Sequence, residues 1–262
     1  MTEDAGVLKQ RYDEIALSLD DTTTACDYNL RDLEIELGLE SIRDGDRILD
    51  VGCGLGVALR RYARDRKVEA HGIDYSGNMV DGAKRRLAED APDLDIDFLE
   101  ASVLELPFDA DSFDVVTSHR CLMALLNWDL QQDALREIHR VLQPGGALVL
   151  MEGTFDGLDR LNFYRRQFGL DEIEAGGRDR LFTLKFHERE LLEFVEPLYE
   201  LTRIQRFGMY YFLTRVVQPL LVAPAAPRYD HPLNEIAKTI ARRIPDFEHM
   251  GQLTGFVLRK RT

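Results

Sequence analysis

One nine-residue run constrains the fold of this chain most, because an apolar segment in it ends in three closely spaced glycines. Residues 48–51 (ILDV) suit a strand that is buried on both faces. Gly52, Gly54 and Gly56 follow, and glycine lets a backbone approach a ligand where a Cβ would intrude. A helix is expected to start at about residue 57. The run therefore predicts a strand, a nucleotide-binding turn and a helix.

The spacing of the glycines distinguishes between kinds of ligand. In the dinucleotide fingerprint G-x-G-x-x-G the third glycine follows the second by three positions, whereas Gly56 follows Gly54 by two. Asp50 stands two positions before the first glycine, where its charge would repel a ligand phosphate. The turn therefore suits a ligand without phosphates that carries an ammonium group, and a nicotinamide-dependent reductase is disfavoured.

A second acidic residue stands at the end of the next apolar run. Asp74 follows Asp50 by 24 residues and closes the run 68–73. An acidic side chain at such a strand end can accept hydrogen bonds from both hydroxyls of a ribose. Two strand ends would then face one ligand, a description that fits S-adenosylmethionine.

Four motifs give the chain a family resemblance. They are ILDVGCGLG at 48–56, HGIDYS at 71–76, LELPFDADSFDVV at 104–116 and REIHRVLQPGGALVL at 136–150. With these motifs, over roughly residues 45–155, the chain resembles the small-molecule type of class I S-adenosylmethionine-dependent methyltransferase. The resemblance implies S-adenosylmethionine as cofactor, S-adenosylhomocysteine as its product, and a Rossmann-like α/β fold.

The alternation of apolar runs predicts a doubly wound, mostly parallel sheet with right-handed crossovers. Two late segments, 201–207 and 253–258, are expected by resemblance to form the antiparallel hairpin that closes a seven-stranded sheet. The other expected strands are 47–51, 68–73, 95–99, 113–118 and 146–152, and the expected helices between them are 57–66, 77–89 and 130–142.

The expected division of the chain is an N-terminal helical lid at residues 1–44 and a methyltransferase domain at 45–262. Helical patterning with a break near residues 18–24 supports the lid. Two inserted segments, at about 154–186 and 208–252, are longer than most loops of compact domains. We expect these insertions to build the acceptor pocket, since they leave the sheet close to where such folds bind ligands.

Composition narrows the classes of partner. The 262 residues are 45% hydrophobic, enough for the core of one elaborated domain. Lys and Arg number 33 against 47 Asp and Glu, and the net charge of −14 disfavours nucleic acid and anionic membrane surfaces as partners. Neither a membrane-spanning run nor a signal peptide is recognisable, so we expect a cytoplasmic protein.

Cysteines and acidic residues give no support for a metal site. Cys26, Cys53 and Cys121 include no C-x-x-C pair, so neither a disulfide framework nor a zinc site is indicated. Acids and histidines do not cluster at ligand spacing either. Cys53 is expected only as a small residue in the glycine turn.

Each part of the cofactor has candidate partners. Asp50 and the carbonyls around Gly52 could accept from its ammonium group, and Arg31 could bind its carboxylate bidentately. Tyr12 could add a hydrogen bond from the lid. Arg31 could instead pair only with a neighbouring acid, and Tyr12 could only pack. The full predicted cofactor set is Tyr12, Tyr28, Arg31, Asp50, Gly52, Cys53, Gly54, Gly56, Asp74, Tyr75, Met79, Ser102, Val103 and Ser118.

Adenine is expected between Tyr75 and Met79 on one side and the loop 101–103 on the other. Many relatives carry Asp at the position of Ser102, where it accepts from the adenine amino group. A hydroxyl can accept the same hydrogen bond, with a smaller contribution. Val103 could offer its backbone N–H to the ring, although Tyr75 and Met79 could also be ordinary core residues.

Methyl transfer requires an in-line nucleophile, and a base only where the acceptor must lose a proton. His119, at the end of the strand 113–118, is the candidate base; it could instead border the cofactor or make only local hydrogen bonds. The expected reaction is O- or N-methylation of a small organic acceptor. C-methylation, and cofactor binding without transfer, are the alternatives. Aromatic and arginine residues of the insertions could line the acceptor pocket, pack in the core or form a homodimer contact.

Overall fold

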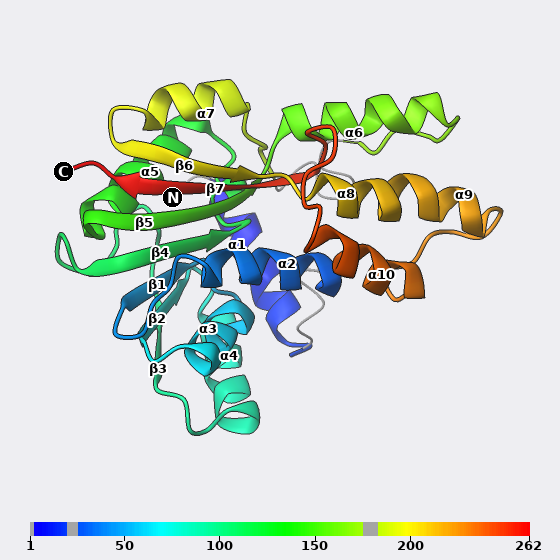
Figure 1. The fold of residues 1–262 in the computed structure, drawn as a ribbon. Helices are drawn as coiled ribbons and strands as arrows, with labels where there is room; N and C mark the ends of the chain where they lie inside the picture. Colours follow the sequence, from blue (N-terminus) through cyan, green and yellow to red (C-terminus); the bar gives the residue numbers. More distant parts are fainter. Residues whose placement is uncertain (1–2, 20–25, 175–182) are drawn as a thin grey trace.

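The computed structural model describes residues 3–19, 26–174 and 183–262. Its described strands form a seven-stranded sheet in the order β3-β2-β1-β4-β5-β7-β6 (Figure 1). The first five strands are parallel, and β7 is antiparallel to both of its neighbours, β5 and β6. The predicted fold class and the closing hairpin are therefore confirmed. The strands are β1 (Arg47–Val51), β2 (Glu69–Asp74), β3 (Ile96–Glu100), β4 (Phe113–His119), β5 (Leu142–Gly153), β6 (Tyr199–Gln205) and β7 (Leu253–Lys260).

Two hydrophobic layers bury the sheet on both faces. Along β1, Ile48 belongs to the layer under α2 and α3, whereas Leu49 belongs to the layer under α5 and α7. Val115 and Val116 of β4 alternate in the same way. The main helices are α1 (Glu3–Ala16), α2 (Tyr28–Leu39), α3 (Val57–Asp65), α4 (Gly77–Asp90), α5 (Trp128–Val141), α6 (Phe155–Gln167), α7 (Glu188–Val195) and α10 (Pro232–Ala241), with shorter turns η1 (Leu122–Ala124), α8 (Gly208–Tyr211), η3 (Phe212–Val217) and α9 (Gln218–Val222).

The start of β5 differs from the prediction. Pro144 and the two glycines after it were expected to form a turn before a strand at 146, but α5 ends at Val141 and β5 begins directly at Leu142. The β4–β5 register shifts between Phe113 and Val115, and Gly145 has a φ of +78°. The turn residues are thus an irregularity within the strand, because Leu142 already pairs before them.

The two insertions form a helical projection at one end of the sheet (Figure 1). The first contains α6, and its residues 175–182 lie outside the described part; the second contains α8, η3, α9 and α10. Lys238 of α10 donates to Asp32 of α2 at 2.8 Å, and Arg242 pairs with Glu36 one turn further along. Among the described residues, no helix is both long enough and apolar enough to cross a bilayer.

Candidate functional site

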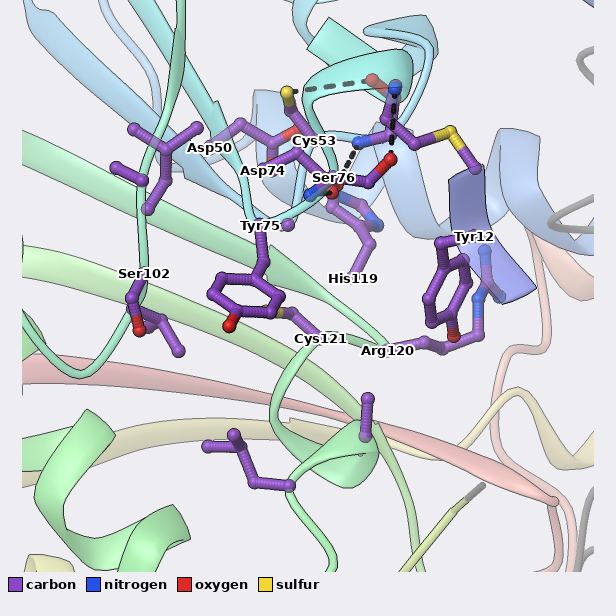
Figure 2. Close-up of a pocket in the computed structure, with 18 of the residues that line it drawn as sticks. Tyr12, Asp50, Cys53, Asp74, Tyr75, Ser76, Ser102, His119, Arg120 and Cys121 are labelled. Atoms are coloured by element: carbon purple, nitrogen blue, oxygen red, sulfur yellow. Dashed lines mark hydrogen bonds between the residues drawn. The ribbon is translucent and has the colours of Figure 1, made fainter. Parts of the chain in front are cut away.

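A cavity of about 580 Å³ opens at the carboxyl ends of β1, β2 and β4 (Figure 2). Helices α1 and α2, the loop after β3, the loop after β4 and the start of α5 complete its wall. Most of the predicted site residues meet here although they are spread over more than a hundred positions. Those lining the cavity are Tyr12, Arg31, Asp50, Gly52, Cys53, Gly54, Asp74, Tyr75, Met79, Ser102, Val103 and His119.

The glycine turn combines close packing with open space. All three glycines have positive φ, and Gly56 immediately precedes α3. A Cβ on Gly52 would lie 2.5 Å from the Cβ of Cys121, and one on Gly56 would lie 2.7 Å from Cζ of Phe98. A Cβ on Gly54 would meet no atom within 4 Å. Gly52 and Gly56 therefore allow the turn to pack, whereas Gly54 faces the cavity that it lines.

Asp74 fastens the end of β2 to this turn. One carboxylate oxygen accepts the N–H of Gly54 and the other accepts the N–H of Ser76, each at 2.9 Å. Burial raises the pKa of Asp74 to about 6, against the lowering effect of these two donors. The carboxylate lines the cavity with acceptor capacity remaining on each oxygen.

Asp50 is almost completely buried at the end of β1. It accepts the hydroxyl of Thr117, from the neighbouring strand β4, at 2.7 Å. Burial raises the pKa of Asp50, because the charged form loses its hydration. The side chain thus links two strand ends and also lines the cavity.

Helix α1 covers the cavity from the α4 side. Asp13 accepts the hydroxyl of Ser76, the residue that caps α4, at 2.5 Å, and its carbonyl accepts the amide of Asn78 at 3.2 Å. Tyr12 packs against a small cluster that includes Met79. Lys9, which the sequence prediction did not include, lines the cavity and forms ion pairs with acidic neighbours.

The predicted adenine wall lies along one side of the same cavity. Tyr75 is 39% exposed and Met79 is buried, so only the tyrosine ring is broadly available to a ligand. Ser102 and Val103, in the loop after β3, line the cavity as the other predicted wall. The Ser102 hydroxyl already accepts the N–H of Leu104 at 3.2 Å, which reduces its capacity to accept from a base.

His119 has protein groups next to both ring nitrogens. Its Nε2 lies 2.9 Å from the hydroxyl of Tyr62, a fully buried residue of α3. Its Nδ1 lies 3.9 Å from the carboxylate of Glu34 on α2. Local hydrogen bonding, one of the alternatives considered from sequence, therefore describes the ring in this structure. Its role as a catalytic base stays a prediction.

Arg120 is the main site residue that the sequence prediction missed. It lines the cavity directly after β4, with a left-handed φ of +59°. Its guanidinium donates to Glu34 at 2.8 Å. Burial alone would raise the pKa of Glu34, but the nearby Arg120 charge holds that pKa below its ordinary value. The only local signal was an arginine beside the candidate base at a strand end.

Three predicted cofactor residues lie outside the cavity lining. Gly56 closes the turn by donating its N–H to the carbonyl of Cys53 at 2.9 Å. Ser118 is fully buried and donates its hydroxyl to Glu152. Tyr28 starts α2 without reaching the cavity wall. Alternation along β4 explains the case of Ser118, because its neighbours Thr117 and His119 point to the opposite face.

The expected contribution of the insertions is also not seen. No described residue of 154–186 or 208–252 lines the cavity. These segments instead pack on α2 and on one another, so the cavity wall comes from the N-terminal helices and the loop after β4.

Comparisons with known proteins agree with this architecture. Residues 48–146 match the family model described as a methyltransferase domain. The chain is similar to a 2-phytyl-1,4-naphtoquinone methyltransferase of a Nostoc species, with 31% identity over 56% of this chain and 64% of the relative. It is similar to the ubiquinone/menaquinone biosynthesis C-methyltransferase UbiE of Vibrio campbellii, with 34% identity over 46% of each chain. For the malonyl-acyl-carrier-protein O-methyltransferase of Enterobacter lignolyticus the identity is 35%, over 44% of this chain and 42% of the relative.

The chain thus spans 42% to 64% of the length of these relatives.

Solved structures show that the similarity of the fold extends over most of the chain. A chain of the complex between the Haloferax volcanii Trm112 methyltransferase activator and a methyltransferase superposes with a TM-score of 0.64 at 20% identity, covering 96% of this chain and 98% of that one. The 4+2 cyclase SpnF superposes with a TM-score of 0.59 at 24% identity, covering 88% and 81%. Residues 48–146 therefore match a methyltransferase domain, and the motifs and sheet order of the chain resemble those of the class I S-adenosylmethionine-dependent methyltransferases.

Proposed function

We propose that this protein transfers a methyl group from S-adenosylmethionine to a small organic acceptor. The observation that carries the proposal is one continuous cavity with two chemically different parts. Asp50, Gly54 and Asp74 form a polar part at the strand ends, and the segment 124–126 with Leu130 forms an apolar part. A polar donor site beside an apolar wall is the arrangement that a two-substrate transfer needs.

The residues present fit the cofactor. Gly54 leaves open space where a ligand backbone can approach, and Asp74 retains acceptor capacity for two ribose hydroxyls. Arg31 lines the cavity from α2 as a cation for the methionyl carboxylate, and Asp50 lies near the turn for the ammonium group. S-adenosylmethionine supplies a methyl group that its sulfonium already activates.

The remaining task of the protein is to position the acceptor and exclude water. Helix α1 covers the cavity through the contacts of Asp13 with the start of α4. The apolar residues 124–126 and Leu130 would hold the acceptor by its nonpolar part. These contributions need no covalent intermediate and no metal.

The nature of the methylated atom is the finer part of the proposal. Oxygen and nitrogen were expected ahead of carbon from sequence, and one relative is named an O-methyltransferase. Another is named a C-methyltransferase, which gives carbon equal support. We therefore propose oxygen or carbon as the acceptor atom, and nitrogen, which was expected equally with oxygen, receives no support from these names.

A second candidate function is cofactor binding without methyl transfer. It is favoured by the similarity to SpnF, which is named a cyclase although its fold is the same. Incubation with methyl-labelled S-adenosylmethionine and a panel of phenols, enols and quinols separates the two. Labelled product with the wild type and none with Asp74→Asn supports transfer. Tight S-adenosylhomocysteine binding without labelled product from any acceptor supports the second candidate.

A further inference from the structure

We propose that Arg120 determines acceptor specificity by binding an oxyanion of the acceptor: a carboxylate, phenolate or enolate oxygen. The inference rests on the proposed methyl transfer and names the acceptor class of the same cavity. Four observations carry it: the backbone of Arg120, the partner of its guanidinium, the surroundings of His119 and the pairing of the other cations.

The backbone of Arg120 is held in a conformation that arginine rarely adopts. Its φ of +59° lies in the left-handed region, which is uncommon for residues other than glycine. The N–H of Arg120 donates to the carbonyl of Met151 on β5 at 2.8 Å, which fixes this turn to the neighbouring strand. Unusual backbone geometry that the surrounding structure maintains is a frequent feature of ligand sites. Here it places a cation at the end of β4, in the cavity wall.

The guanidinium of Arg120 has a fixed partner and spare donors. Glu34 is fully buried and accepts one N–H at 2.8 Å. A guanidinium has five N–H donors, so this contact orients the group and leaves donors for a ligand. The second oxygen of Glu34 lies 3.9 Å from Nδ1 of His119, beyond hydrogen-bond distance. Glu34 thus accepts one of the five donors and holds the guanidinium of Arg120 in place.

The surroundings of His119 disfavour it as a base, so they favour an acceptor that does not have to give a proton to this residue. Both ring nitrogens face protein groups, at Tyr62 and Glu34. An acceptor that binds as an oxyanion beside Arg120 has already lost its proton, since a nearby cation lowers the pKa of a phenol or enol.

In the transfer, an electron pair of the oxyanion, or of a carbon conjugated with it, forms the bond to the methyl carbon. The bond from methyl to sulfur breaks and its electron pair stays on sulfur. When carbon is methylated, the hydrogen on that carbon then leaves as a proton to water.

The other cavity cations have separate assignments. Lys9 forms ion pairs with two carboxylates, Asp13 at 3.3 Å and Glu100 at 3.6 Å, which neutralise its charge. Arg31 lies on α2 and is proposed above for the methionyl carboxylate. Arg120 follows β4 directly, lines the same cavity as the segment 124–126, and is the remaining cation among the lining residues.

The test uses two matched probes on protein saturated with S-adenosylhomocysteine. They are 1-hydroxy-2-naphthoate and its uncharged amide, titrated calorimetrically at one pH and ionic strength. The wild type should bind the anion roughly tenfold or more tightly than the amide, because a hydrogen bond to a charged group is stronger than one between neutral groups. Arg120→Met should reduce this preference to about twofold or less while S-adenosylhomocysteine affinity stays within about twofold.

Arg120→Met leaves Glu34 buried and unpaired, which could unfold the protein. The double variant Arg120→Gln with Glu34→Gln removes both charges, keeps a polar side chain at each position and should show the same loss of preference. Arg31→Met is the reciprocal control and should weaken S-adenosylhomocysteine instead. The inference is overturned if the wild type shows no preference for the anion, if the folded Arg120 variants keep it, or if they weaken S-adenosylhomocysteine as much as Arg31→Met does. Failure of the wild type to bind S-adenosylhomocysteine would instead refute the proposed function.

Discussion

Cofactor affinity should depend on pH through Asp74. The pKa of its buried carboxyl group is raised to about 6 in the free protein, whereas the ordinary value is 3.8. Ribose hydroxyls would donate to the ionised form, so S-adenosylhomocysteine should bind that form preferentially. Protonation of Asp74 as the pH falls through about 6 should therefore weaken binding.

The size of the effect follows from the fraction of Asp74 that is ionised. The apparent Kd rises by the factor 1 + 10^(pKa − pH), which is close to one at pH 8, about twofold at pH 6 and about elevenfold at pH 5 for a pKa of about 6. Asp74→Asn should bind with a Kd that does not change over this range. At pH 8 the variant should lose about 3 kcal/mol of binding free energy, roughly a hundredfold in Kd, because one ribose hydroxyl loses its acceptor and the other keeps only a neutral one.

Calorimetric titration with S-adenosylhomocysteine between pH 5 and pH 8, at constant ionic strength, measures both effects. Asp95→Asn is the matched control, since this exposed carboxylate lies just before β3, away from the cavity, and should leave the profile unchanged. A flat wild-type profile would refute the link between the Asp74 charge and binding. An elevenfold pH effect that survives in Asp74→Asn would assign it to another group.

Three further changes test other parts of the structure. Asp13→Ala removes the tether of α1 to α4, and should weaken S-adenosylhomocysteine several-fold and speed amide exchange in α1, with Asp13→Asn giving a smaller effect. Gly56→Ala should destabilise the fold by about 2–3 kcal/mol in urea unfolding, because its Cβ meets Phe98, whereas Gly54→Ala should cost about 1 kcal/mol but impair cofactor binding. Burial raises the pKa of Glu152 from 4.5 to about 7, so its contribution to stability is complete below pH 4.5 and is lost as the pH rises through about 7. Between pH 5 and pH 8, urea unfolding should therefore show Glu152→Gln gaining about 2.5 kcal/mol relative to the wild type, and an equal difference at both pH values would contradict this.

The sheet and the cofactor side of the cavity could be predicted from sequence because their signals are local. Residues 48–51 are apolar enough for burial on both faces, and the glycines after them fix the turn that follows. Asp74 could be placed because carboxyl ends of adjacent parallel strands meet at one edge of a sheet, and β1 pairs with β2. Once the strand order is assumed, these positions follow from chain order alone.

The acceptor side could not be predicted in the same way, because its contacts are long-range. Glu34 and Arg120 are separated by 86 residues and neither belongs to a sequence motif. The hydrogen bond at Nε2 of His119 likewise depends on Tyr62, 57 residues away on α3. Insertion length suggested that 154–186 and 208–252 would line the acceptor pocket, but length says nothing about the direction in which a segment packs.

The second insertion nevertheless bears on the site, through α2. Asp32 and Glu36 are four residues apart and lie on one face of this helix, where Lys238 and Arg242 of α10 hold them. Arg31 lines the cavity, and Glu34, three residues further along, reaches Arg120 in its wall from the same side of the helix. Helix α10 therefore contacts α2 on the side opposite to the cavity. Its contribution to the site is to fix the orientation of the helix that carries Glu34, although none of its described side chains lines the cavity.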